Sequence, residues 1–188
     1  MKPTQSIYIL LSLFLTFSFS EDLRVEIIKR YDNGNKKLLV KYRGEGVDEV
    51  VVERITYTES GDILILENIL DKMKMEREYY KNGQIWEEKN YKDGEKDGKW
   101  TDYYENGQIR SEGNFKDGEK DGKWTYYYDN GQIWSDGNYK DGRRDGKWTL
   151  YYENGQISHE VNYKDGELDG KWTDYYENGQ ISREVNYK

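Results

Sequence analysis

Short aromatic runs alternate with polar, glycine-containing stretches along most of the chain, and no apolar period of about 3.6 residues persists in residues 75–188. Residues 124–128 read Trp-Thr-Tyr-Tyr-Tyr, which favours a β-strand. Asn130-Gly131 follows, and an Asn-Gly pair between two such runs is the strongest short-range hairpin signal, because both residues accept positive φ angles. The pattern therefore predicts antiparallel hairpins rather than helices.

The return strand of this hairpin shows a two-residue alternation. Because successive side chains of a strand point to opposite faces of the sheet, the pattern places Ile133 and Ser135 on one face and Trp134 on the other. An Asp-Gly pair at 141–142 marks the turn into the next unit. Gly137 lies inside the strand, where glycine usually weakens it. We expect its missing side chain to make room for a neighbouring aromatic ring.

The hairpin recurs every 24 residues. The Gly-Lys-Trp-Thr motif carries Trp100, Trp124, Trp148 and Trp172, and the Asn-Gly-Gln-Ile motif carries Gly83, Gly107, Gly131, Gly155 and Gly179. Because the end units of a repeat array must cap the stack, we interpret residues 21–74 as divergent N-terminal repeats and residues 75–188 as the regular array. The predicted fold is all-β, an elongated single-layer meander of tandem β-hairpin repeats of about 24 residues.

The first twenty residues differ in character from the rest of the chain. Lys2 is followed by an apolar run from Ile7 to Phe19, and small residues precede Glu21. The run of 13 residues is too short for a membrane-spanning helix, which needs about 20. This layout is typical of a cleaved secretory signal peptide at residues 1–20. It predicts a secreted, periplasmic or cell-surface protein with no transmembrane segment after cleavage.

Charge and composition narrow the classes of partner. The chain has 29 Lys and Arg against 37 Asp and Glu, for a net charge of −8, so it lacks the basic character that nucleic-acid binding requires. Aromatic residues make up 15% of the chain and supply large buried areas, which argues against disorder. The absence of cysteine from the sequence removes disulfides, thiol chemistry and zinc–thiolate sites.

The sequence shows no catalytic or metal-binding constellation. His159 is the only histidine, and no serine or cysteine nucleophile stands in a recognisable motif. The acidic turn at 93–97 looks like the opening of a calcium loop, but Tyr104 occupies the twelfth position, where a bidentate glutamate is needed. We therefore predict no enzymatic activity, no catalytic residue, no cofactor and no bound metal.

The regular unit has a distinctive motif. It reads Tyr-Tyr-Glu-Asn-Gly-Gln-Ile at 103–109, Glu-Gly-Asn-Phe-Lys-Asp-Gly at 112–118 and Gly-Lys-Trp at 122–124. This unit resembles the MORN repeat family, and in particular its bacterial variant. The resemblance implies an elongated meander of β-hairpins and a role as a scaffold or interaction surface, with no catalytic residues. Bacterial proteins with such repeats often carry a YwqK-type antitoxin label.

One position departs from the repeat. After the isoleucine of each return strand come Trp86, Arg110, Trp134, Ser158 and Ser182. Polar residues at three of these five positions indicate that the position faces solvent, and exposed tryptophans often mark contacts. We predict a secreted or periplasmic scaffold that binds a protein partner, with Trp86 and Trp134 as candidate contact residues. Two alternatives stay open: an antitoxin role, and binding of a carbohydrate or envelope glycan by stacked aromatics, as in the similar hairpin repeats of choline- and glucan-binding surface proteins.

Overall fold

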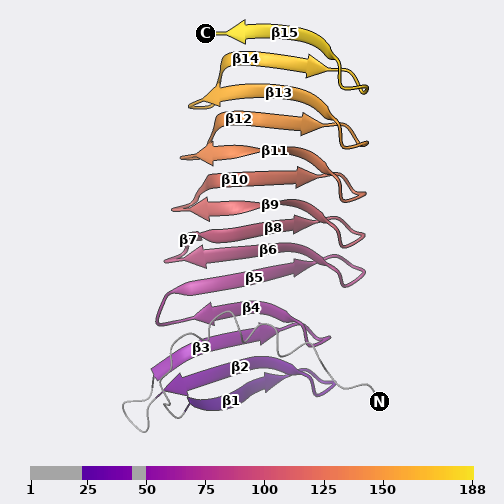
Figure 1. Cartoon of the computed structure of the whole chain (residues 1–188). Helices are drawn as coiled ribbons and strands as arrows, with labels where there is room; N and C mark the ends of the chain where they lie inside the picture. Colours follow the sequence, from indigo (N-terminus) through magenta and orange to yellow (C-terminus); the bar gives the residue numbers. More distant parts are fainter. Residues whose placement is uncertain (1–22, 44–49) are drawn as a thin grey trace.

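The computed structural model describes residues 23–43 and 50–188, which form one antiparallel sheet of 15 strands (Figure 1). The strands are β1 (Leu23–Arg30), β2 (Lys36–Arg43), β3 (Val50–Tyr57), β4 (Ile63–Asn68), β5 (Met73–Tyr79), β6 (Ile85–Lys92), β7 (Glu95–Lys96), β8 (Gly98–Tyr103), β9 (Ile109–Lys116), β10 (Glu119–Tyr127), β11 (Ile133–Lys140), β12 (Arg143–Tyr151), β13 (Ile157–Lys164), β14 (Glu167–Tyr175) and β15 (Ile181–Tyr187). Each strand pairs with its sequence neighbours, except that the short β7 pairs with β6 alone. The predicted all-β, single-layer meander of tandem hairpins is confirmed.

Figure 1 shows the strands stacked into an elongated ladder, with the Asn-Gly loops along one side and the Asp-Gly turns along the other. Among the residues that the structure describes, no helix is long and apolar enough to cross a membrane. The predicted signal peptide at residues 1–20 lies outside the described residues.

The Asp-Gly turns close the tight side of the ladder. Asp117 and Gly118 have φ angles of 49° and 85°, and they connect Lys116 directly to its partner Glu119. Positive φ angles at both central residues are what a two-residue type I′ turn requires. Aspartate and glycine both tolerate this conformation, so the pairing of the residues alone accounts for these turns.

The Asn-Gly loops are built differently. Within the pair at 106–107 only Gly107 has a positive φ angle, of 84°. The amide of Gln108 donates to the side-chain oxygen of Asn106 at 2.9 Å, and the amide of Tyr104 donates to the carbonyl of Gln108 at 2.8 Å. Asparagine therefore contributes a side-chain hydrogen bond, and not the positive φ angle on which the sequence argument relied.

A tyrosine from each Asn-Gly loop except the last reaches the next hairpin. Tyr104 Oη donates to the backbone carbonyl of Tyr127 at 2.7 Å. Equivalent bonds start from Tyr80, Tyr128 and Tyr152. In the N-terminal third, Tyr31 Oη donates in the same way to the carbonyl of Tyr57 at 3.0 Å. Whether residues 21–74 are diverged repeats stays a prediction.

In the regular array the core is a row of tryptophan rings on one face of the sheet, and aliphatic side chains such as Ile55 and Met75 are buried in the N-terminal part. Trp124 and Trp148 are only 2% and 1% exposed. Residues 122–124 bulge opposite Gly113, and a Cβ atom on that glycine would overlap the ring of Trp124. Gly137 stands in the same relation to Trp148. The expectation that the mid-strand glycine makes room for an aromatic ring is confirmed.

The tryptophans take two arrangements, according to the residue found 11 positions earlier. Gly113 stands 11 residues before Trp124, and Nε1 of Trp124 donates to the carbonyl of Asn114 at 3.0 Å. Trp172 follows Val161, and its Nε1 donates to the carboxylate of Asp174 instead. Trp148 takes the first arrangement and Trp100 the second. The two arrangements thus differ at two positions: the residue on the preceding strand, and the aspartate that stands two residues after Trp100 and Trp172 but not after Trp124 and Trp148.

Candidate interaction surface

The row of core tryptophans is covered by other rings and by cations. The ring centroids of Trp124 and Tyr139 are 6.1 Å apart, in an edge-to-face arrangement. Lys120 Nζ lies 3.8 Å above the centroid of Trp124. Lys96 and Arg144 take the equivalent places in their units. A cation over an aromatic face is stabilising, so these rings serve the fold.

Trp134 lies beside this row because it stands at a β-bulge. Ser135 pairs with Tyr126 and Ile133 pairs with Tyr127, which leaves Trp134 unpaired in the register. Its ring lies 6.1 Å from that of Tyr126, which in turn contacts the core tryptophans. The alternation argument placed Trp134 on the face opposite Ser135. That prediction is wrong, because a bulge inserts one residue and interrupts the two-residue period.

The predicted exposure of the two bulge tryptophans is confirmed. Trp86 is 37% exposed and Trp134 is 45% exposed, and 46% of the side chain of Arg110 is exposed at the equivalent position between them. Ser158 departs from the prediction: it is only 5% exposed and lies within hydrogen-bond distance of His159 Nδ1, at 2.8 Å. Whether Trp86 and Trp134 contact a partner stays a prediction.

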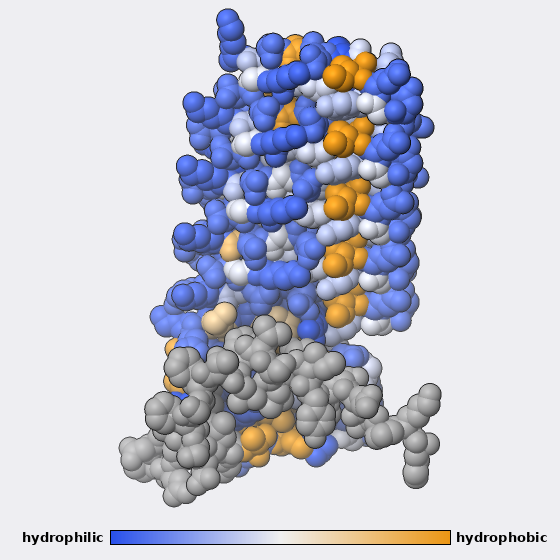
Figure 2. All heavy atoms as spheres, in the orientation of Figure 1, coloured by the Kyte–Doolittle hydropathy of each residue, from blue (hydrophilic) through white to orange (hydrophobic). Residues whose placement is uncertain are grey.

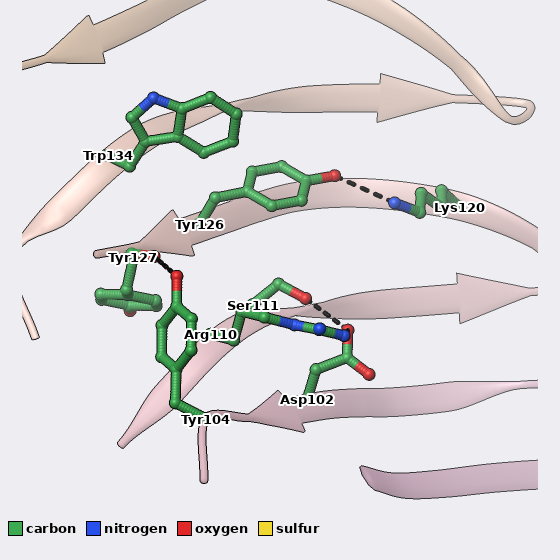
Figure 3. A pocket seen from close by; sticks show the side chains of 8 residues that line it. All are labelled: Asp102, Tyr104, Arg110, Ser111, Lys120, Tyr126, Tyr127 and Trp134. Atoms are coloured by element: carbon green, nitrogen blue, oxygen red, sulfur yellow. Dashed lines mark hydrogen bonds and ion pairs between the residues drawn. The ribbon is translucent and has the colours of Figure 1, made fainter. Parts of the chain in front are cut away.

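A hollow of about 330 Å³ is lined by Trp134 and Arg110, together with their neighbours (Figure 3). In Figure 3 the ring of Tyr126 lies between Trp134 and the guanidinium of Arg110, which extends toward Asp102. The residues that line the hollow are Asp102, Tyr104, Arg110, Ser111, Lys120, Tyr126, Tyr127 and Trp134. They come from β8, β9, β10 and β11 and the loop between β8 and β9, so neighbouring units build the hollow together.

Hydrogen bonds and charges hold the polar groups of the hollow. Lys120 Nζ donates to Tyr126 Oη at 2.9 Å, and Oη of Tyr126 lies 3.1 Å from that of Tyr139. Burial raises the pKa of Tyr126 and lowers the pKa of Lys120. Arg110 Nη2 lies 3.8 Å from the carboxylate of Asp102. The hollow thus offers two cations and one carboxylate beside one exposed indole ring and part-buried tyrosine rings, which suits an anionic group joined to an apolar one.

Sequence reasoning found only part of this arrangement. It singled out Trp134 but not the neighbouring Tyr126 and Lys120. The signal was present, because Tyr126 stands where the other regular units have Asp102, Leu150 and Asp174. The structure does not bring Trp86 into the hollow; its ring contacts Tyr80, with centroids 6.4 Å apart.

The opposite face of the sheet carries repeated ion pairs. Lys99 Nζ lies 2.9 Å from a carboxylate oxygen of Glu112, and Tyr127 Oη donates to the same carboxylate at 2.9 Å. Burial, followed by this bond to a carboxylate, raises the pKa of Tyr127 to about 12. Figure 2 shows a largely hydrophilic surface, with a column of hydrophobic side chains in step with the hairpins. The isoleucine after each Asn-Gly loop of the regular array recurs with that period, at Ile85, Ile109, Ile133, Ile157 and Ile181.

The described residues show no clustering of metal ligands. Across residues 23–43 and 50–188, no three His, Cys, Asp or Glu side chains gather closely enough to hold a metal ion. His159 Nε2 lies 3.5 Å from Asp174, and its ring packs edge-on against Trp172. Its surroundings are those of a side chain packed into its strand.

Comparison with known proteins agrees with this architecture. Comparison with curated proteins gives no match. A family model described as the MORN repeat variant matches five successive segments, residues 75–93, 96–117, 120–141, 144–165 and 168–188. Together these segments cover more than half of the chain, and each contains one Asn-Gly loop. The chain belongs to the MORN repeat family, and its repeats are of the variant type.

Proposed function

We propose that this protein is a secreted, periplasmic or cell-surface scaffold that binds a protein partner through the face carrying Trp86 and Trp134. Repeats of this family are non-catalytic and generally mediate interactions with proteins or membranes. The signal-like character of residues 1–20 supports a location outside the cytoplasm.

The observation that carries the proposal is the contrast between two sets of tryptophans. Trp124 and Trp148, which recur in phase with the units, are 2% and 1% exposed, whereas Trp86 and Trp134 are 37% and 45% exposed. Large aromatic side chains contribute a major share of interface energy when a partner buries them. Two of them at equivalent positions on one sheet form an extended contact surface rather than a single small-molecule site.

A carbohydrate ligand is the second candidate, because the hollow beside Trp134 combines an exposed ring with polar groups. An antitoxin role would also use a protein partner, which would then be a toxin. Identification of the captured protein separates that role from a general scaffold, and a glycan array tests the carbohydrate alternative.

Affinity capture from the native culture tests the proposal. The mature chain is compared with the double variant Trp86→Ser and Trp134→Ser, in which both positions take the residue that units with Ser158 and Ser182 already carry. We expect the melting temperature to stay within a few degrees and a specific partner protein to be lost. The matched control is Ile133→Ser, next to Trp134 but paired with Tyr127; it should keep the partner.

Two results would contradict the proposal. If the folded double variant still captures every protein that the wild type captures, the binding face lies elsewhere. If the double variant unfolds, the two rings are structural. A mature N-terminus at Glu21, measured by mass spectrometry of the exported protein, is the expected result for the localisation.

A further inference from the structure

We propose that the partner segment bound by this face is a polyproline II helix with an acidic residue at its centre and an apolar residue three positions to either side. The inference rests on the proposed function, because it specifies the kind of protein segment that Trp86 and Trp134 contact. Its basis is the spacing and chemistry of three side chains.

Trp86, Arg110 and Trp134 form a line across the sheet. Each is the unpaired residue of a β-bulge at the start of its return strand, so the three share one face. They lie on β6, β9 and β11, and in the sheet order each of these strands is two strands from the next. With strands about 4.8 Å apart, the positions recur about every 9.6 Å.

This interval matches the repeat of a polyproline II helix. That helix rises about 3.1 Å per residue with three residues per turn, so every third residue returns to the same side after about 9.3 Å. An extended strand returns after about 6.6 Å, and an α-helix returns at the seventh residue after about 10.5 Å. Over the two intervals from Trp86 to Trp134, the polyproline II repeat falls short by less than 1 Å, whereas the helix overshoots by nearly 2 Å, as rough estimates.

The chemistry along the line specifies the segment further. Two exposed indole rings flank a guanidinium, and aromatic surfaces are the usual contact for polyproline II segments. Among the described residues Lys120 takes part in no ion pair, although it lines the hollow beside Arg110. Two cations therefore face one carboxylate, Asp102, and a second carboxylate from the ligand would balance them. An acidic residue placed between two apolar ones fits this order.

The two units after Trp134 lack the large side chains of this line. In the next two units the bulge position holds Ser158 and Ser182, and no equivalent tyrosine stands at the position of Tyr126. The line of large side chains therefore ends at Trp134. A ligand segment should cover the sheet from β6 to β11 and leave β13 to β15 free.

A peptide array tests the inference directly. The probes are immobilised heptapeptides with glutamate at the centre, proline at the four intervening positions, and Leu, Phe, Trp or Pro at the two ends. We expect at least one probe to bind the purified mature chain. Removal of one proline between the centre and an end should abolish binding, because it takes that end off the line.

Charge reversal provides the matched control. Arg110→Ser should weaken binding of the glutamate-centred probe by about tenfold or more. Arg110→Glu should reverse the preference, so that a lysine-centred probe binds better than the glutamate-centred one. Because Arg110 is partly exposed and serine occupies the same position in later units, both variants should keep the wild-type melting temperature within a few degrees.

The inference is overturned if no probe binds, if binding ignores the proline count, or if a helical peptide with heptad spacing or an oligouronate binds in place of the probes. Loss of the native partner in the Trp86→Ser, Trp134→Ser variant, together with failure of every proline probe, would leave the protein-binding proposal standing and remove only the polyproline inference. If the double variant keeps its partner while probe binding depends on Arg110 as expected, the polyproline preference stands and the proposal that Trp86 and Trp134 bind the native partner is removed.

Discussion

At the scale of single residues, a missing side chain on the preceding strand leaves space for the rings of Trp124 and Trp148. Gly113 leaves space for the ring of Trp124, whereas the unit with Val161 has its tryptophan bonded to Asp174. We expect Gly113→Val to cost about 1–3 kcal/mol of unfolding free energy, as overpacking usually does. Chemical denaturation measures this cost.

The matched variant for this prediction adds Tyr126→Asp to Gly113→Val. Aspartate at 126 reproduces the acceptor that Asp174 gives to Trp172. The double variant should therefore be more stable than the sum of the two single changes predicts. Strict additivity would show that the glycine and the acceptor act independently.

The residue scale also shows how far the sequence could predict the site. The space above Gly137 and the exposure of Trp134 could both be predicted, because repeats allow one position to be compared across units. The face of the sheet on which Trp134 lies could not be predicted. A bulge depends on the register between two strands, and an alternation count within one strand does not contain that register. Tyr126 could have been found as a departure from the aspartate or leucine of the other regular units.

At the scale of the hairpin, both kinds of turn were predicted from Asn-Gly and Asp-Gly pairs. The tyrosine bond between hairpins was not predicted, because it joins residues 23 positions apart in the sequence.

Tyr104→Phe removes the bond to the carbonyl of Tyr127. It should cost about 0.5–1.5 kcal/mol, the usual net value of a hydrogen bond. The matched control is Tyr176→Phe, since Tyr176 is 58% exposed in the final loop and its hydroxyl has no partner among the described residues. Equal losses in both variants, measured by denaturant unfolding, would contradict the prediction.

The lysine–glutamate pairs on the opposite face of the sheet should make the stability of the fold sensitive to acid. Hydrogen bonds from Lys99 and Lys147, respectively, lower the pKa of Glu112 and Glu160 below the ordinary value of 4.5. A carboxylate whose pKa is lowered on folding stabilises the fold above its unfolded value, and that contribution is lost as the pH falls through the folded value. The melting temperature should therefore drop below about pH 4.5.

The control for the acid prediction is the double variant Glu112→Gln and Glu160→Gln. It should be less stable than the wild type at pH 7 and should lose less on acidification. An identical pH profile in the two proteins would show that other carboxylates cause the acid transition.

At the scale of the whole molecule, each strand in the described part of the chain pairs only with its neighbours in the sheet, so damage should stay local at first. Trp124 is 2% exposed, and Trp124→Ala should cost roughly 3–5 kcal/mol. Hydrogen exchange should rise in residues 100–147 before it rises in β14 and β15. Trp134→Ser is the control and should leave exchange in the core unchanged. Uniform exchange along the array after Trp124→Ala would mean that the sheet unfolds as one cooperative unit.

The direction of the strands has a mechanical consequence. In an antiparallel ladder the interstrand hydrogen bonds run perpendicular to the strands, which in this sheet means along the long axis of the molecule (Figure 1). A tension applied between the two ends of the array loads these bonds one rung after another, as in the opening of a zipper, and not all together as in shear. Under such a load the protein should lengthen at low force in equal steps. Each step should release one unit of 24 residues, or roughly 80 Å of extended chain.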